Sequence, residues 1–323
     1  RGFGAQKELT TNNNHQEDSD SHLTETAGYI NAATSTGFTI GAGSSSQNYT
    51  NRAGASYVAW CWKANAATTT SNGASGDIKA SVTQREDTAK FAMCTYTGTG
   101  INAGQSHRVN HGLGVVPAVM MFKSRGADGD WVVYHHKNTS APETDYLKLD
   151  ANTATTDQAE VWHDTEPTSA VFTAGDFSGS NRSGDDFVGY FWNEIQGFSK
   201  FGSYTGNGNA DGPFIHLGFQ PAVVFTKRTD SSGNWNVFDN RRTGATKGST
   251  LGKANPMEQL LHPDLSNAEV NVSDGGHTID GLATGFKIRS SSAISNTNGG
   301  TYIYMAFAAA PLTNSNGVPC NAM

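Results

Sequence analysis

Two adjacent histidines are the first candidates for chemistry in this sequence. His135 and His136 could bind a metal ion, because imidazole is a common zinc ligand. Neighbouring residues on a β-strand point to opposite faces, so the two rings cannot share one ion without distortion. A similar segment further along the chain has Asp239 and Asn240 at the equivalent place. We therefore predict no metal site here.

Two further histidines recur beside glycine in similar segments. His111 and His216 take what looks like the same place in each segment. An active site is normally kept in one copy of a repeat, whereas a structural contact recurs in all copies. We expect these imidazoles to have a structural role, such as a hydrogen bond to the backbone of a turn.

Acidic side chains gather in residues 17–20 (Glu-Asp-Ser-Asp) and 163–167 (His-Asp-Thr-Glu-Pro). Acid–base catalysis by two carboxyl groups requires them to face each other across a cleft several ångströms wide. Loop residues close together in sequence do not establish that geometry. We expect solvated loop charge at both places.

Other known motifs are incomplete or absent. Residues 126–130 (GADGD) and 273–276 (SDGG) lack the alternating ligands and final Glu of a calcium loop, and Asp-Gly is common in ordinary turns. Residues 41–45 (GAGSS) lack the lysine of a phosphate loop, and no nucleophile elbow or HExxH is present. The sequence predicts no catalytic, cofactor-binding or metal-binding residue and no cofactor, and it does not identify receptor-binding residues. Three glycosylation sequons suit surface loops: Asn48, Asn138 and Asn271.

The charge of the chain argues against nucleic acid and membrane partners. The 323 residues carry a net charge of −7, and the basic residues are scattered, whereas nucleic-acid binding needs clustered Lys and Arg. No apolar stretch reaches the 18 residues or so of a membrane-spanning helix. The three cysteines, Cys61, Cys94 and Cys320, have no CxxC spacing, and we expect Cys61 to be a small core residue.

An internal repeat is the most informative feature of the sequence. Residues 96–123 and 204–227 both begin Tyr-Thr-Gly-x-Gly, pass a His near a Gly, and run through Pro-Ala-Val into an apolar strand that ends in Lys. A turn with Gly and a strand opening on Trp follow in each copy. Three pairs of landmarks keep the same spacing of 104 residues: Pro117 and Pro221, Gly129 and Gly233, Trp131 and Trp235.

The closing half of this repeat occurs three times. The aromatic runs 57–64 (YVAWCWKA), 187–194 (FVGYFWNE) and 302–309 (YIYMAFAA) each follow a shorter strand centred on Phe38, Phe172 or Phe286. We therefore expect a partial unit at 1–66, a connector at 67–90, full units at 91–198 and 199–312, and a polar tail at 313–323. The absent opening half and the missing first Met suggest that this sequence is part of a longer chain.

Short, evenly spaced strand signals predict an all-β fold of tandem antiparallel β-sandwich, jelly-roll-like repeats of about 105 residues. Large side chains on both faces of residues 57–62 predict a central strand or one that contacts another unit. Within 151–169 one helical turn is possible, and 256–263 (PMEQLLHP) is the best candidate for a short helix. Strands are expected at 91–96, 118–123, 131–135, 146–149, 170–173 and 187–192.

Together, the YTGxG motif, the Pro-Ala-Val strands, the Trp-opening hairpins and residues 57–64 resemble a family of uncharacterised repeat domains in structural proteins of marine bacteriophages. The ending 314–322 (NSNGVPCNA) is also similar to the ends of such chains. The resemblance covers nearly the whole chain. It implies a tail-fibre-like or other virion-surface protein, often with a lectin-like domain upstream, and it carries over no catalytic or binding residue.

Three functions follow from these features. The first is a non-enzymatic bacteriophage tail fibre or adhesin on the virion surface, outside the cell, that presents sandwich loops to a host glycan or protein and so gains avidity from several weak contacts. The second is an architectural protein, either a capsid decoration or a fibre shaft. The third, a tail-spike glycan hydrolase, lacks the acid pair it needs. We expect partners among other virion proteins and homo-oligomers, with a trimer suggested by analogy with phage fibres. Host, receptor, oligomer symmetry and tail or capsid location stay open.

Overall fold

The computed structural model describes residues 9–17, 29–34, 37–41, 51–64, 78, 80–100, 107–242, 256–271 and 279–309. Nearly all of its regular structure is strand, and its named strands pair antiparallel. The expected all-β class is confirmed. Within the described ranges no helix has the length and apolar character to cross a lipid bilayer.

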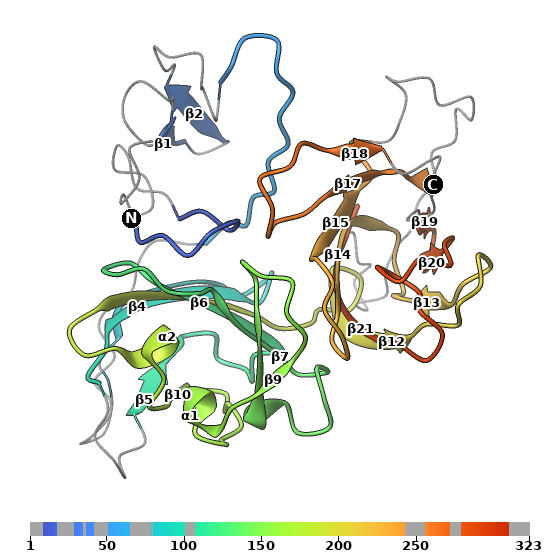
Figure 1. Ribbon diagram of the computed structural model, residues 1–323. Coiled ribbons are helices and arrows are strands. Elements are labelled where there is room, and N and C mark those ends of the chain that lie inside the picture. The colour runs from blue at the N-terminus through green and yellow to red at the C-terminus, as the bar shows by residue number, and fades with distance from the viewer. Residues whose placement is uncertain are drawn as a thin grey trace.

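The first sheet is built from residues 80–192 and has a smaller sheet beside it (Figure 1). Its interior strand β11 (Asp186–Trp192) pairs with β4 (Phe91–Thr97) on one side and with β6 (Val119–Ser124) on the other. The remaining strands are β3 (Ala80–Glu86) at the β4 edge, then β7 (Val132–His135), β8 (Asp145–Lys148) and β9 (Thr156–Asp157) beyond β6. The smaller sheet pairs β5 (His107–Asn110) with β10 (Val171–Ala174). Two single-turn helices, α1 (Ala159–Trp162) and α2 (Ser178–Asn181), and a 3₁₀ turn (Pro142–Thr144) complete this part.

The second sheet has the same strand order as the first. Its longest interior strand pairing is at β21 (Thr301–Ala308), which lies between the edge strand β12 (Ser199–Thr205) and β14 (Pro221–Arg228). Beyond β14 follow β15 (Asn236–Asp239), β17 (Gln259–Leu261) and β18 (Val270–Asn271). The order β12-β21-β14-β15-β17-β18 thus matches β4-β11-β6-β7-β8-β9 strand by strand. The smaller sheet here is β13 (Phe214–His216), β20 (Gly285–Ile288), β19 (Ile279–Leu282) and β16 (Pro256–Met257).

Each large sheet buries both of its faces, because its central strand carries large side chains on both sides. One face of β11 contributes Phe187 and Phe191 to a core shared with β5, β10 and α1, and the corresponding face of β21 packs on β13, β19 and β20. We call these the first-sheet core and the second-sheet core. The other faces of the two sheets meet in a third cluster, the shared core. Its members include Trp192, Phe201, Val223, Ile303, Met305 and Phe307.

The N-terminal region, residues 9–64, also reaches the shared core. Trp60 and Trp62 pack against it, with the Trp62 ring 6.0 Å from Trp192 and 5.4 Å from Phe307 between centroids. This region also has one hairpin of its own, β1 (Tyr29–Ala33) with β2 (Phe38–Gly41). Figure 1 shows that hairpin apart from both large sheets, at the upper left. Of the two alternatives for the run 57–62, the structure shows packing against other parts of the chain and not a central strand.

Most of the expected strands are present. The six strands expected between 91 and 192 correspond to β4, β6, β7, β8, β10 and β11, and α1 supplies the helical turn expected within 151–169. The hairpin loop after Ser124 joins β6 to its neighbour β7. Part of the connector forms β3, which adds an edge strand to the first sheet.

Three expectations were wrong. Residues 256–263 contain the strands β16 and β17 and not a helix, because Gln259–Leu261 extends the second sheet beside β15. Residues 57–64 lie in no strand among the described residues, although their counterparts β11 and β21 are central strands. Cys61 is exposed and not a core residue, since none of the described strands covers its face, whereas Cys94 is buried in β4.

Candidate functional site

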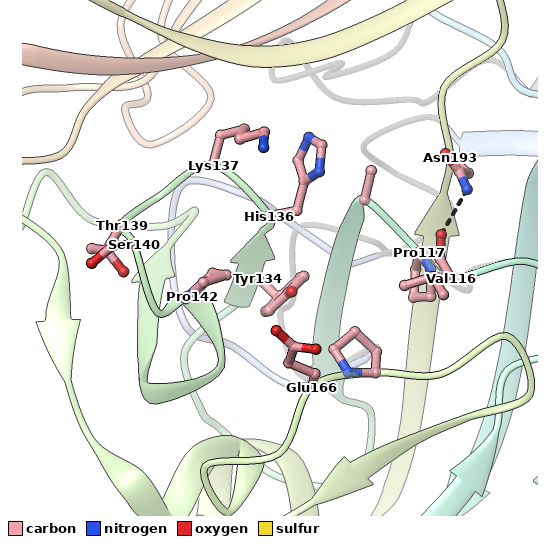
Figure 2. Close-up of a pocket in the computed structure, with 12 residues that line it drawn as sticks. Val116, Pro117, Tyr134, His136, Lys137, Thr139, Ser140, Pro142, Glu166 and Asn193 are labelled. Atoms are coloured by element: carbon pink, nitrogen blue, oxygen red, sulfur yellow. Dashed lines mark hydrogen bonds between the residues drawn. The ribbon is translucent and has the colours of Figure 1, made fainter.

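The described residues contain an open pocket of about 530 Å³ on the first sheet. Figure 2 shows Tyr134, His136 and Lys137 from the end of β7 on one side, and Glu166 from the loop after α1 with its carboxylate turned toward Tyr134. Asn193, after β11, donates to the Val116 carbonyl at 2.7 Å and closes another wall. The remaining lining residues are Pro117, Ala118, Thr139, Ser140, Pro142 and Pro167.

The pocket brings together parts of two candidates from the sequence, the histidine pair and residues 163–167. His136 and Glu166 both line it. His163 and Asp164, which follow α1, have left-handed backbone (φ 54° and 45°) and turn the chain. Burial, followed by Glu143 and Glu166, raises the pKa of the Tyr134 hydroxyl. The described residues contain no group of three metal-binding side chains.

The histidine pair contacts the second sheet. His135 Nε2 lies 3.1 Å from the Tyr304 carbonyl of β21, and His136 Nε2 lies 3.0 Å from the Phe201 carbonyl of β12. The expectation that the rings point to opposite faces was wrong, because β7 ends at His135 and the alternation of a strand ends with it. Both rings act as connectors between the two sheets.

His135 is held in one neutral tautomer. Its Nδ1 accepts a hydrogen bond from the Lys137 N–H at 3.1 Å, so the proton is on Nε2, which donates to Tyr304. Protonation of Nδ1 would remove that acceptor. Burial, with His136 as a second cause, lowers the pKa of His135 to about 3. Burial likewise lowers the pKa of His136.

His111 has the same pair of contacts within the first sheet. Its Nε2 lies 3.0 Å from the Thr168 carbonyl, and its Nδ1 accepts from the Leu113 N–H at 3.1 Å. Burial lowers its pKa to about 4. This geometry agrees with the hydrogen bond to a turn backbone that we expected.

His216 is not the counterpart of His111. Val109 pairs with Phe172 and Ile215 pairs with Phe286, so the strand register places His216 at the position of Asn110. A shift of one residue moves a side chain to the other face of a strand. His216 is accordingly exposed, whereas His111 is buried. The matching of these two histidines by sequence was therefore wrong.

The first acidic candidate contributes a contact and not a catalytic pair. Glu17 accepts from the Arg125 guanidinium at 2.7 Å, while residues 18–20 lie outside the described ranges. In residues 126–130, Asp128 accepts from the Gln16 N–H at 2.9 Å and Asp130 forms an ion pair with Lys148 at 2.5 Å. These carboxylates therefore join segments of the chain.

Two buried lysines are functional candidates that the sequence analysis missed. Lys227, at the end of β14, donates from Nζ to the carbonyls of Gly233 (2.6 Å), Thr153 (2.8 Å) and Asn152 (3.3 Å). Burial lowers its pKa to about 8. Lys123, at the end of β6, donates to the Gly129 carbonyl, which corresponds to Gly233. The signal was present, because both lysines end the repeated Pro-Ala-Val strands.

The tryptophan hairpins, β6–β7 and β14–β15, each bind a segment from elsewhere in the chain. Trp131 Nε1 donates to the Thr10 carbonyl at 2.8 Å, and Trp235 Nε1 donates to the Lys148 carbonyl at 2.7 Å. We call residues 10–17 the first docking segment and residues 148–155 the second docking segment.

The backbone contacts of the two docking segments also match. The Gly129 N–H donates to the Asn14 carbonyl and the Gly233 N–H to the Asn152 carbonyl, both at 2.8 Å. The Glu17 N–H donates to the Arg125 carbonyl, and the Thr155 N–H donates to the Thr229 carbonyl. In all three contacts, the residue of the second docking segment is 138 positions after its equivalent in the first. The residue of the second hairpin is 104 positions after its equivalent in the first hairpin. The two interfaces therefore have one geometry.

The remaining candidates carry no site. Asn138 is buried and its side-chain oxygen accepts from Thr155 at 2.7 Å, so the expectation of an exposed sequon was wrong there. The side chain of Asn271, in β18, lies outside the described residues. Also outside them are Asn48, Cys320, residues 273–276 and all of 41–45 except Gly41.

Comparison with known proteins gives one match. A family model described as "Domain of unknown function (DUF7483)" matches residues 3–311. No curated protein and no solved structure matches the chain.

Proposed function

We propose that this chain, which belongs to the DUF7483 family, is a non-enzymatic structural protein of a bacteriophage virion surface, of the tail-fibre or adhesin kind. In this proposal it consists of tandem jelly-roll-like sandwich units that present loops to a host glycan or protein. The virion setting is an inference from the resemblance of the repeated motifs as a set to marine phage structural proteins, and no single residue carries it.

The observation that carries the proposal is the double occurrence of one docking geometry. The same strand order appears in both large sheets, and each tryptophan hairpin holds a docking segment through equivalent hydrogen bonds. Such repetition is typical of proteins whose units pack on each other to build an assembly. Catalysis would instead require one distinctive site.

The use of the histidines supports a non-enzymatic role. His111 and His135 have a backbone partner on each ring nitrogen, and His136 has a backbone carbonyl on Nε2. A general base needs an imidazole nitrogen that can reach a substrate proton. These rings form hydrogen bonds that support the fold, and we infer that they do not act as general bases.

A purely architectural role, as a capsid decoration or shaft protein, is the second candidate. The shared core favours it, because side chains from both large sheets and from the N-terminal region meet in one cluster. That arrangement buries apolar surface between the three parts, which suits a component held in a lattice. Homo-oligomers and contacts with other virion proteins are expected under either proposal.

Immunogold labelling of particles from a phage that encodes this chain tests the proposal. We expect label on the particle surface, at tail fibres for the adhesin or over the capsid for the decoration protein. Absence of the protein from purified particles would overturn both. A glycan array and host-cell binding then distinguish the adhesin, which binds, from the decoration protein, which binds capsids alone.

The hydrolase alternative is tested at the pocket. Host polysaccharide is incubated with the wild-type protein and with the variant Glu166→Gln, which removes the one carboxylate among the pocket's lining residues. We expect unchanged polysaccharide length with both. Shortening by the wild type that the variant abolishes would show that the protein is an enzyme.

A further inference from the structure

The N-terminal region matches the closing half of each sheet-forming part but has no counterpart of the opening half among the described residues. The β1–β2 hairpin corresponds to β19–β20, since Ile30 pairs with Ile40 as Ile279 pairs with Ile288. Residues 57–64 correspond to β11 and β21, because Trp62 takes the place of Trp192 and Phe307 in the aromatic run. These three side chains meet in the shared core.

The apolar face of the N-terminal region is exposed where its counterparts are buried. Ile30 and Ile40 are 38% and 42% exposed, whereas Ile279 and Ile288 are 0% exposed. Burial alternates along residues 58–64: Trp60 and Trp62 are half-buried, whereas the residues at 59, 61 and 63 are exposed. The exposed face includes Ala59 and Cys61, which correspond to the buried Tyr304 and Ala306 of β21.

A third docking segment lies near Trp60 of the run 57–64. Residues 262–269 follow β17 as residues 148–155 follow β8, and the register of the strands gives a constant shift of 114 residues. The Pro263 carbonyl accepts from the Thr11 hydroxyl at 2.8 Å, and Arg242 joins Glu269 at 2.9 Å while lying 5.7 Å from the Trp60 ring. Ser266 and Glu269, which correspond to the docked Asn152 and Thr155, are exposed.

The hairpins that could bind the third docking segment are already engaged. Of the six tryptophans, Trp131 and Trp235 directly precede the second strands of the two hairpins. The two hairpins bind residues 10–17 and 148–155. Trp60 and Trp62 lie in the N-terminal region, Trp162 in α1 and Trp192 in β11. None of the other four tryptophans therefore lies in a hairpin equivalent to β6–β7 or β14–β15 among the described residues.

We propose that the exposed face formed by residues 29–34, 37–41 and 57–64, together with the third docking segment, is one binding surface for a polypeptide that carries the opening half of the same kind of unit. Its two outer strands pair with the two edges of residues 57–64, as β12 and β14 pair with β21. Its tryptophan hairpin binds residues 262–269. Its apolar side chains cover Ile30, Ile40 and Cys61 and complete a third core.

The exposed apolar residues of the molecule concentrate on this surface. Contiguous exposed apolar side chains mark an interaction site more often than scattered ones do. Of the six large hydrophobic residues that are exposed among the described residues, Ile30, Ile40 and Tyr57 belong to it, and Val270 directly follows the third docking segment. The surface continues an interface that the chain forms twice, so its partner follows from the two occupied examples. The inference does not depend on the virion setting of the protein.

The test uses the full chain with Cys320→Ser, so that alkylation reports on Cys61 while Cys94 is buried. The probe is a polypeptide with the sequence of residues 199–242, which contains β12 to β15. We expect saturable binding and alkylation of Cys61 slowed at least about ten-fold. A control probe with Lys227→Met and Trp235→Ala, which lacks the hairpin contacts, is expected to bind at least about ten-fold more weakly.

Matched variants of the chain locate the binding. Ile30→Asp with Ile40→Asp is expected to abolish probe binding, whereas Val116→Asp with Phe214→Asp, at exposed apolar residues elsewhere, leaves it unchanged. Equal probe binding by the two double variants would overturn the proposal.

A probe that does not fold in isolation is fused ahead of Arg1 through a flexible linker, which raises its effective concentration. We expect a higher Tm and protected Cys61 in the fusion with residues 199–242, and neither in the fusion with the control sequence. Unchanged Tm and unprotected Cys61 in this fusion would overturn the proposal. Self-association that protects Cys61 without any probe would also overturn it, because the occupant would then be a second copy.

Discussion

His111 and His135 show how single residues of this protein are committed to structure. Each ring donates from Nε2 to a backbone carbonyl and accepts at Nδ1 from the N–H two residues later. Both nitrogens are therefore occupied in the neutral form. The difference is in their partners, because His111 binds its own sheet whereas His135 joins β7 to β21.

The variant His135→Gln tests this at the level of pH. The pKa of His135 is lowered to about 3 in the folded protein, against about 6.5 in an unfolded chain, so the unfolded state binds the extra proton as pH falls below 6.5. Wild-type stability therefore decreases as pH falls from about 6.5 to about 3. Gln keeps a donor for Tyr304 but does not titrate, so the variant loses less stability in this window. Urea unfolding at several pH values measures the difference.

Other groups titrate in the same pH window, so the test depends on the difference in stability between the wild type and His135→Gln. Burial raises the pKa of Asp150 to about 6, which makes its contribution to stability fall as pH rises toward 6. That contribution is common to both proteins and cancels. Parallel stability curves for wild type and variant would contradict the assignment of His135.

Lys227 gives a second prediction at the residue scale. Lys227→Met fills similar space but leaves the carbonyls of Gly233 and Thr153 without the lysine donor, whereas the Asn152 carbonyl keeps the Gly233 N–H. A buried acceptor without a partner costs about 1–3 kcal/mol, so we expect a loss of that size in the free energy of unfolding. Lys200→Met, at a residue outside the hairpin interfaces whose Nζ makes one exposed contact, is the control and should lose less. Equal losses would contradict a special role for Lys227.

At the scale of elements, the tryptophan hairpin is the unit that joins one part of the chain to the next. Its turn supplies a glycine N–H and its second strand an indole N–H, and both donate to carbonyls of the docking segment. The lysine that ends the first strand binds the turn from inside. The hairpin therefore presents a fixed set of donors to an extended segment.

Removing the indole donor should loosen the docking segment locally. Trp235→Phe keeps the ring in the shared core but loses the hydrogen bond to Lys148, at a cost of about 1 kcal/mol. We expect faster hydrogen exchange at Thr155, whose N–H binds Thr229 across the same interface. Trp162→Phe loses an equivalent bond to Asp145 inside the first sheet and should leave Thr155 unchanged. The same exchange at Thr155 in both variants would contradict the docking role.

Sequence patterns predicted the strands well because apolar alternation and turn residues are local signals. The spacing of Pro117, Gly129 and Trp131 from their counterparts identified the hairpins, and these form in the same way. The errors have one physical cause, which is that burial and pairing depend on distant partners. Cys61 has the local pattern of a core strand without a covering sheet, and Leu260 has that of a helix but pairs with Phe238. The pocket could not be predicted from the sequence for the same reason, since its lining residues Glu166 and His136 are far apart in the chain.

At the scale of the whole molecule, the shared core holds together three parts that would otherwise be separate. Side chains from the first sheet, the second sheet and the N-terminal region meet there, whereas the first-sheet and second-sheet cores each belong to one sheet. Burial of apolar surface is the main source of folding free energy, so a cluster that spans the three parts couples their stabilities. Trp62 is the best single probe, because it belongs to neither sheet and touches Trp192 and Phe307.

The most direct measurement is hydrogen exchange of the variant Trp62→Ala under native conditions. We predict that the amides of β11 and of β21 both lose protection, because the cavity lies between the two central strands. Phe172→Ala, in the first-sheet core alone, should lower protection in β11 far more than in β21. Loss of protection in only one sheet of the Trp62 variant, or in neither, would contradict the claim that the repeated parts are joined through one shared core.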